Sequence, residues 1–255
     1  MQSSPIGVVE SGILKPFIVF FIFLFATTFS PAGDDFISQQ KKYPNVRTAF
    51  NEKNFQVIHD LENRELDKNN LNIILVAYKD EKFIEVYGKN NSDSNFKIVI
   101  RYPFCFSIGK LGPKRMVNDR QIPEGFYRIS LFNPQSQYFL SLKINYPNKS
   151  DSILGVRGKY GGDIFIHGDC ATIGCIPISN DIKELYLYAM YARNSGQSDI
   201  PVYIFPFIMS DNKFDLYKTN KNYLFWENLK EGYDIFDSTK KKLNYDVDKQ
   251  GNYIF

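Results

Sequence analysis

The stretch IILVAYKDEKFIEVY, residues 73–87, predicts the fold class of this chain. Two runs rich in β-branched and aromatic residues flank the polar segment Lys79–Lys82, which is the pattern of a β-hairpin. Further runs of this kind follow along the chain. They cover residues 96–101, 104–108, 125–131, 138–145, 163–167 and 202–207. We therefore expect a mainly β domain that closes on itself.

Helical patterns occur on both sides of these runs. Apolar residues recur at helical spacing over about Asp181–Arg193, and Ser179 and Asn180 supply N-cap oxygens. Before residue 70 the chain is polar with scattered apolar residues, which predicts short helices. After Met209 we expect a helix followed by short strands. The predicted fold class is mainly β with flanking helices.

The start of the chain resembles an export signal. Phe17–Phe29 contains no charged side chain and is followed by small residues in Ser30–Ala32. The run is shorter than the roughly 20 residues that a bilayer-spanning helix needs. An uncleaved anchor extended through Ile13 and Leu14, and a buried helix, remain alternatives. We expect the protein to be periplasmic or otherwise extracytoplasmic, where disulfides are allowed, with membrane contact only through this segment.

The chain divides into four predicted segments. They are a signal peptide or membrane anchor (1–32), an N-terminal helical segment (33–70), the β domain (71–210) and a C-terminal extension (211–255). With 255 residues, 44% of them hydrophobic, the chain can bury a core. Its 31 Lys and Arg against 28 Asp and Glu give a net charge of +3, and no basic run interleaves with aromatic residues. We therefore expect no nucleic-acid partner.

Scarce reactive residues gather in IHGDCATIGC, residues 166–175, which holds one of two histidines and two of three cysteines. His167 ends a predicted buried strand, where a rigid scaffold can hold a catalytic group. Cys175 follows Gly174, and a glycine at that place permits a sharp turn that exposes the sulfur. Because an imidazole near a thiol can take its proton, these residue types suit nucleophilic acyl transfer.

Other interpretations of this segment stay open. Cys175 can be a buried, inert thiol, or it can pair with Cys170 in a disulfide. A zinc site made of His167, Cys170 and Cys175 would lack a fourth ligand in the neighbourhood. We expect no metal and no cofactor. His59 lies in a polar stretch and is predicted to be a solvated surface residue.

Six spaced segments between residues 100 and 209 carry a family resemblance. They are SIGKLGPK (107–114), DRQIPEGFY (119–127), NPQS (133–136), YPN (146–148), HGDCATIGC (167–175) and IFPF (204–207). In this order they resemble SGxLGPK, GDxQxPEGFY, NPxS, YPN, HGxCxSxGC and FPF of the L,D-transpeptidase catalytic domain family. This is the YkuD-type family, and its YafK/DpaA-like branch is the most similar.

The resemblance implies a β-sandwich or barrel-like catalytic domain over residues 71–210 and a peptidoglycan stem peptide with meso-diaminopimelate as substrate. It implies that Cys175 is the nucleophile and that His167 is the base, held in its tautomer by the carbonyl of Gly168. The N–H groups of Gly174 and Cys175, with the Thr172 hydroxyl, would form the oxyanion hole. An amine or water would then resolve a thioester, giving L,D-transpeptidation or hydrolysis.

Two departures from the broader family affect substrate binding. Ile173 stands where histidine is frequent, although the branch tolerates an apolar residue there. Ile176–Ile178 replaces a segment where arginine is frequent. The cations that can compensate are Lys114, Arg120 and Arg157, with a solvated surface position as the alternative for each. A substrate groove can also be lined by Tyr127 and Tyr160, whose alternative role is packing. Pro123–Gly125 requires only a turn, so we assign no catalytic role to Glu124.

The resemblance also suggests partners. Besides peptidoglycan stem peptides, the branch suggests release of groups attached to the wall, such as a lipoprotein. The alternative from another functional class is a noncatalytic cell-wall-binding module whose thiols are locked in a Cys170–Cys175 disulfide.

Overall fold

The computed structural model describes residues 1–3, 7, 35–107 and 109–255. The apolar run Phe17–Phe29 of the predicted export signal lies outside the described residues. Within the described part of the chain, none of the helices combines the length and apolar character needed to cross a bilayer. Residues 34–255 form one compact unit. The predicted N-terminal helical segment and C-terminal extension therefore pack together with the β domain.

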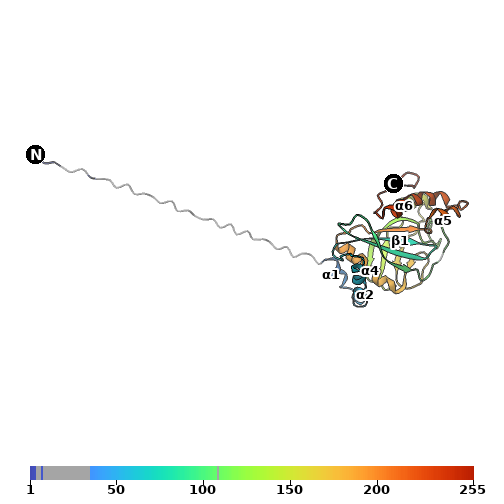
Figure 1. Ribbon diagram of the computed structural model, residues 1–255, viewed down its shortest axis with the longest axis horizontal. Helices are drawn as coiled ribbons and strands as arrows, with labels where there is room; N and C mark the ends of the chain where they lie inside the picture. Colours follow the sequence, from blue (N-terminus) through green and yellow to red (C-terminus); the bar gives the residue numbers. More distant parts are fainter. Residues whose placement is uncertain (4–6, 8–34, 108) are drawn as a thin grey trace. The chain divides into compact units, whose positions relative to one another are not determined.

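A mixed sheet of eight strands, in the order β3-β2-β1-β8-β4-β5-β6-β7, forms the centre of this unit (Figure 1). The pairs β1–β8 and β6–β7 are parallel, and the other neighbours are antiparallel. The strands are β1 (Leu71–Tyr78), β2 (Phe83–Asn90), β3 (Lys97–Pro103), β4 (Gly125–Asn133), β5 (Ser141–Ile144), β6 (Phe165–His167), β7 (Ile176–Pro177) and β8 (Pro201–Phe205). A separate two-stranded sheet joins β9 (Asp246–Val247) to β10 (Tyr253–Ile254).

The predicted hairpin is present as β1 and β2, with Tyr78 opposite Phe83. Alternate residues of β1 belong to two different hydrophobic cores. Ile73 and its neighbours at positions 71, 75 and 77 lie in one core, and Ile74 and its neighbours at 76 and 78 lie in the other. A strand covered on both faces needs a continuous apolar run, which explains why this segment shows no polar alternation.

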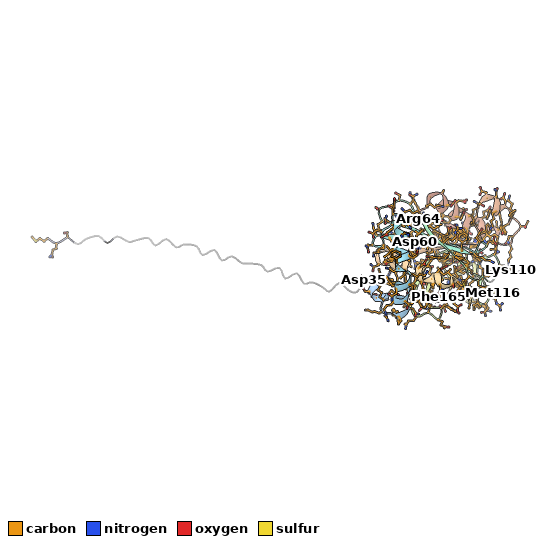
Figure 2. The ribbon with its side chains drawn as sticks, turned by 60° about the horizontal axis from the view of Figure 1, so that its bottom comes forward. Asp35, Asp60, Arg64, Lys110, Met116 and Phe165 are labelled. Atoms are coloured by element: carbon orange, nitrogen blue, oxygen red, sulfur yellow. A yellow bond between two sulfur atoms is a disulfide. The ribbon has the colours of Figure 1, made fainter. Side chains whose placement is uncertain are left out.

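Helices cover both faces of the sheet. The first core contains residues of α1 (Phe36–Gln40), α2 (Pro44–Glu62) and α4 (Ile182–Asn194), and the second contains residues of α5 (Asp211–Asp215) and α6 (Tyr223–Thr239) (Figure 1). Side chains fill the space between the sheet and these helices (Figure 2). Two short helices, α3 (Lys149–Leu154) and the 3-10 turn η1 (Ser179–Asp181), complete the fold. The mainly β class with flanking helices is confirmed.

The two outer strands of the sheet meet at one end, which gives it a barrel-like curvature. The N–H of Cys105, just past β3, donates to the carbonyl of Pro177 in β7 at 3.0 Å. Cys105 is also joined to Cys170 by a disulfide, with 5.5 Å between the Cα atoms. A register shift between Ile129 and Leu131 bends β4 where it leaves β8 for β5.

Two strands predicted from sequence differ in the structure. The segment expected to be a strand over 104–108 has no regular structure over Phe104–Ser107, because its backbone turns across to β7 and its cysteine enters the disulfide. The strand expected over 138–145 begins only at Ser141. Residues 138–140 are turn and bend, and they pack beside β6.

A buried ionic group fastens the C-terminal extension to the β domain. Lys79 Nζ donates to Glu124 Oε1 at 2.7 Å, and to the carbonyls of Gly112 and Ile122. The other carboxylate oxygen of Glu124 accepts from Trp226 Nε1 at 2.7 Å. Glu124 and Trp226 are fully buried. The segment between Gly112 and Ile122 is therefore held from both ends, and it forms one wall of the cavity described next.

Candidate active site

His167 is the last residue of β6, and Cys175 lies immediately before the adjacent parallel strand β7. Ile166 is in register with Ile176, so the preceding residues, Phe165 and Cys175, also lie side by side. His167 is two residues beyond Phe165 along β6, so it lies on the neighbouring strand and two residues further along than Cys175. With a rise of about 3.3 Å per residue and a strand spacing of about 4.8 Å, their Cα atoms are roughly 8 Å apart.

Two glycines allow the loop between these strands to lie close to its neighbours. A Cβ on Gly168 would be 2.4 Å from the carbonyl oxygen of Tyr138. Gly174 has φ +137°, and a Cβ there would be 2.9 Å from the carbonyl oxygen of Gln121. Any other residue at these positions would push apart the backbone segments that surround the site.

His167 is buried and has one free ring nitrogen. Its Nδ1 is hydrogen-bonded to the carbonyl oxygen of Gly168, and since a carbonyl only accepts, Nδ1 carries the proton. Nε2 is buried and has no hydrogen-bond partner among the described residues. Burial lowers the pKa of His167 from its ordinary value, against the opposing effects of Gly168 and Asp169. The side chain is thus a neutral imidazole with a free lone pair, which is the form of a base.

Cys175 is a free, partly buried thiol. Its Sγ accepts from the N–H of Phe165 at 3.5 Å and lies 3.7 Å from the carbonyl oxygen of Asp163, to which the S–H can donate. Burial raises the pKa of Cys175, while the Phe165 N–H and the charge of Lys114 act in the opposite direction. The sulfur of Cys175 thus faces the backbone of Phe165 and Asp163, and His167 is a neutral imidazole.

These shifts predict the pH dependence of the reaction. If His167 is the base, it acts only when neutral, so activity should fall as the pH drops through its pKa, which lies below the ordinary value of 6.5. We expect the acid limb of kcat/KM below pH 6.5. Because the pKa of Cys175 lies above its ordinary value of 9.0, the alkylation rate with iodoacetamide should keep rising beyond pH 9. An alkylation rate that reaches its plateau below pH 7 would show that Cys175 is already a thiolate there, which would contradict a neutral thiol beside a neutral imidazole.

Thr172 occupies the centre of the predicted oxyanion hole. Its Oγ1 accepts from the N–H groups of Gly174 (3.1 Å) and Cys175 (2.8 Å), and its hydroxyl donates to the Cys175 carbonyl at 3.0 Å. The structure therefore brings the three predicted groups together, but both N–H groups already bind the hydroxyl oxygen. The hydroxyl must move aside before these N–H groups can bind a substrate oxygen.

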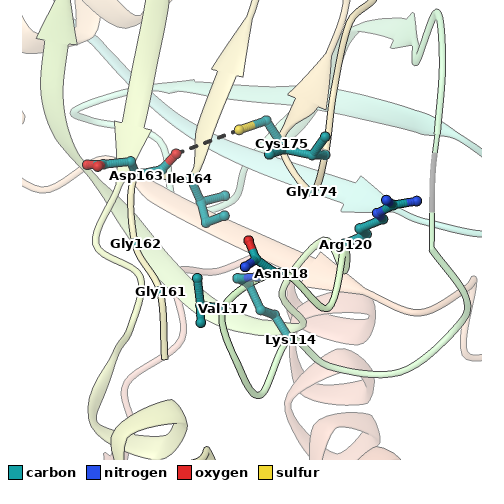
Figure 3. A pocket seen from close by; sticks show the side chains of 11 residues that line it. Lys114, Val117, Asn118, Arg120, Gly161, Gly162, Asp163, Ile164, Gly174 and Cys175 are labelled. Atoms are coloured by element: carbon teal, nitrogen blue, oxygen red, sulfur yellow. Dashed lines mark hydrogen bonds between the residues drawn. The ribbon is translucent and has the colours of Figure 1, made fainter. Parts of the chain in front are cut away.

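A cavity of about 590 Å³ opens beside the Cys175 sulfur. Figure 3 shows Lys114 and Asn118 across this cavity from Cys175. The lining residues are Lys114, Val117, Asn118, Arg120, Gly161, Gly162, Asp163, Ile164, Ile173, Gly174 and Cys175.

Two of the predicted substrate-binding cations line the cavity. Lys114 is not a solvated surface cation but is only 5% exposed, with Nζ bound to Asp119 Oδ1 at 2.7 Å and to the Met116 carbonyl at 3.0 Å. An ammonium has three donors, so one remains. Arg120 is exposed and has a left-handed backbone, with φ +57°. Lys114 is paired with Asp119, so the exposed positive charge at the cavity is that of Arg120.

Other candidates are placed elsewhere. Tyr160 is not among the residues that line this cavity, and its hydroxyl donates to the carbonyl of Ser152 at 2.8 Å, so its role in substrate binding stays a prediction. Arg157 is exposed and also absent from the lining. His59 is exposed on α2, as predicted.

Sequence reasoning missed three residues of the site. Asn118, with φ +63°, presents an amide to the cavity, and Asp163, with φ +55°, gives its carbonyl to Cys175. Tyr138 stacks on His167 with 4.4 Å between the ring centroids. No pattern in the sequence could show these contacts, because each depends on how a loop folds back over the sheet.

The disulfide corrects two alternatives. Cys170 is paired with Cys105, and Cys175 is free, so a Cys170–Cys175 disulfide does not form. The zinc site that required Cys170 as a ligand is contradicted for the same reason. Three pairings are possible among the three cysteines. Only Cys170 with Cys175 was considered from the sequence, because these two are close in sequence and Cys105 is distant.

Comparisons with known proteins identify the family and the relatives that this chain resembles. A family model described as the L,D-transpeptidase catalytic domain matches residues 72–204. The putative L,D-transpeptidase YafK of Escherichia coli (strain K12) is 34% identical over 185 residues, which cover 71% of this chain and 73% of the relative.

Solved structures with detectable similarity include two bacterial proteins. The helical cell shape determining protein Pgp2 from Campylobacter jejuni has 21% identity and a TM-score of 0.42, covering 69% of this chain and 73% of that one. Bd1075 of Bdellovibrio bacteriovorus has 24% identity and a TM-score of 0.39, covering 64% of this chain and 62% of that one.

Proposed function

The chain belongs to the L,D-transpeptidase catalytic domain family, and we propose that it is a cysteine acyltransferase acting on peptidoglycan stem peptides at meso-diaminopimelate. One observation carries this proposal. A free thiol immediately precedes β7, and a buried imidazole ends the adjacent parallel strand β6, with Nδ1–H bound to Gly168 and Nε2 without a partner among the described residues. A free thiol with a neutral imidazole on the neighbouring strand supports a cysteine nucleophile with a histidine base.

The proposed reaction begins with transfer of the Cys175 proton to His167 Nε2. The thiolate attacks the carbonyl carbon of the diaminopimelate residue, and the carbonyl oxygen takes the negative charge. Collapse of this intermediate breaks the bond to the leaving group, which receives the proton from the imidazolium. A thioester on Cys175 remains. Attack by an amine or by water then releases the acyl group and regenerates the thiol.

The cavity beside the sulfur is suited to an anionic peptide. Lys114 is held by Asp119 with one donor unused, and Arg120 is exposed at the same cavity, so we propose that both bind substrate carboxylates. These two cations take the place of the arginine that is frequent after the cysteine in the broader family, where this chain has Ile176–Ile178. An amine acceptor gives L,D-transpeptidation and water gives hydrolysis, including release of a wall-attached lipoprotein when that protein is the leaving group.

We propose that this reaction takes place outside the cytoplasm. The Cys105–Cys170 disulfide supports an oxidising compartment, where such bonds persist. The apolar run Phe17–Phe29 supports export through an N-terminal signal or anchor.

Product analysis tests the proposal. Purified sacculi and diaminopimelate-containing muropeptides are incubated with the wild type or with Cys175→Ala, with and without an added amine acceptor, and products are identified by mass spectrometry. New crosslinks or amine adducts indicate transpeptidation, and new monomers or shortened stems indicate hydrolysis. Identical products from both proteins on every substrate would refute Cys175 as the nucleophile.

A further inference from the structure

The imidazole of His167 is covered by an aromatic ring from a different part of the chain. The ring of Tyr138 stacks on it, with 4.4 Å between centroids and 26° between planes. Tyr138 belongs to the turn between β4 and β5, nearly 30 residues away in sequence from His167.

The turn that carries Tyr138 is fixed by its backbone. The N–H of Tyr138 donates to Ser136 Oγ at 3.1 Å, and the N–H of Leu140 donates to the Tyr138 carbonyl at 3.0 Å. The N–H of Gly168 donates to the Leu140 carbonyl at 3.3 Å. The same Tyr138 carbonyl lies so close to Gly168 that a Cβ there would clash. These backbone contacts place Tyr138 next to His167, where its ring can stack on the imidazole.

Tyr138 separates His167 from a second cavity. This cavity, of about 540 Å³, lies beside the disulfide, and Tyr138 is among its lining residues whereas His167 is not. Tyr138 is 37% exposed, while His167 is 1% exposed. One ring face of the imidazole is thus shielded from solvent by the tyrosine, and Nδ1 is held in the ring plane by Gly168.

We propose that Tyr138 is a positioning residue for the reaction, whose ring holds the imidazole of His167 in place and stabilises the imidazolium that forms when Cys175 loses its proton. The inference rests on the proposed function. A cation against the face of an aromatic ring is attracted by its π electrons, most strongly where water is excluded. The ring thereby offsets part of the cost of creating a charge on a buried histidine.

Three titratable groups lie near His167 and bear on how its pKa changes when Tyr138 is replaced. Asp169 from the same loop favours the protonated imidazole, Cys175 lies on the neighbouring strand, and Tyr138 covers the ring face. Replacing the tyrosine ring with the smaller leucine side chain leaves an apolar group at this position and removes the π electrons. The imidazolium is then less stable, so the pKa of His167 should fall.

The test compares Tyr138→Leu with Tyr138→Phe, which keeps the stacking ring. We expect Tyr138→Leu to lower kcat about tenfold with KM within about twofold, and to move the acid limb of kcat/KM down by about 0.5 to 1 in pH. Tyr138→Phe should match the wild type in all three quantities. An unchanged profile in Tyr138→Leu, or an acid limb that moves upward, would overturn the proposal.

A measurement without turnover separates this proposal from the proposed function. In proteins carrying Cys175→Ala, NMR titration of the His167 ring gives its pKa and tautomer directly. We expect a lower pKa with Tyr138→Leu than with Tyr138→Phe, and ring-proton signals shifted by the aromatic neighbour only in the latter. If Tyr138→Leu does not fold, the proteins with Tyr138 or with Tyr138→Phe still provide a test. In both, the His167 ring must show the aromatic shift of its protons and a proton on Nδ1. Their absence would overturn the stacking, even if the enzyme is active.

Discussion

Replacing Cys175 with alanine is expected to reduce turnover of diaminopimelate muropeptides by at least about 10³-fold, because no other thiol can form the thioester. The other two cysteines are joined to each other in the disulfide. His167→Ala should cause a loss of similar size, since the thiol would keep its proton near neutral pH. Residues that act as one unit have non-additive effects, so the double variant should be no slower than either single one.

The chain provides a matched control for the histidine substitution. His59 is the other histidine, exposed on α2 and far in sequence from the site, so His59→Ala should leave kcat and KM unchanged. The comparison uses initial rates of muropeptide conversion followed by chromatography. The fold-losses in turnover of Cys175→Ala and His167→Ala are compared with that of the double variant. If the loss in the double variant is the product of the two single losses, the two side chains do not work as a pair.

Removing the carboxylate of Glu124 is expected to cause the largest loss of stability. Glu124→Leu leaves the buried Lys79 ammonium without its counter-charge, which costs about 3–5 kcal/mol of the free energy of unfolding. It also leaves the Gly112 N–H and Trp226 Nε1 donors unsatisfied. Trp226 is the only tryptophan in the chain and donates directly to this carboxylate, so its fluorescence during urea unfolding measures the effect.

Two further variants give this prediction its controls. Lys79→Met combined with Glu124→Leu removes both charges and should recover part of the loss. Lys149→Ala breaks the exposed pair with Asp246, whose side chains are 59% and 81% exposed, and should leave the free energy of unfolding nearly unchanged. A loss below about 1.5 kcal/mol for Glu124→Leu would show that the buried pair does not hold the cavity wall.

Local patterns in the sequence predicted the elements whose neighbours do not alter them. The hairpin over 73–87 and the helix over about Asp181–Arg193 appear as β1–β2 and as α4, Ile182–Asn194. Both segments are long and strongly apolar, so propensity and burial agree. The segment 33–70 was expected to form short helices, but it contains the 19-residue α2, which is stabilised by packing on α4.

Long-range contacts account for what could not be predicted. Cys105 pairs with Cys170 because the sheet curls until β3 and β7 meet, and no spacing in the sequence records that curvature. Lys114 looked like a surface cation, yet the loop that carries it is drawn inward by Lys79 and Glu124. Tyr138 had the pattern of a strand residue, but the chain turns there to cover His167.

The most direct test of the account is intact-protein mass spectrometry during turnover. Wild-type protein is mixed with a diaminopimelate muropeptide and quenched with acid within the first turnovers, and the modified peptide is mapped. We expect an added mass equal to the acyl portion of the substrate, located on Cys175, removed by hydroxylamine and absent from Cys175→Ala. Product formation without any adduct on Cys175, or an adduct on another residue, would contradict the central claim.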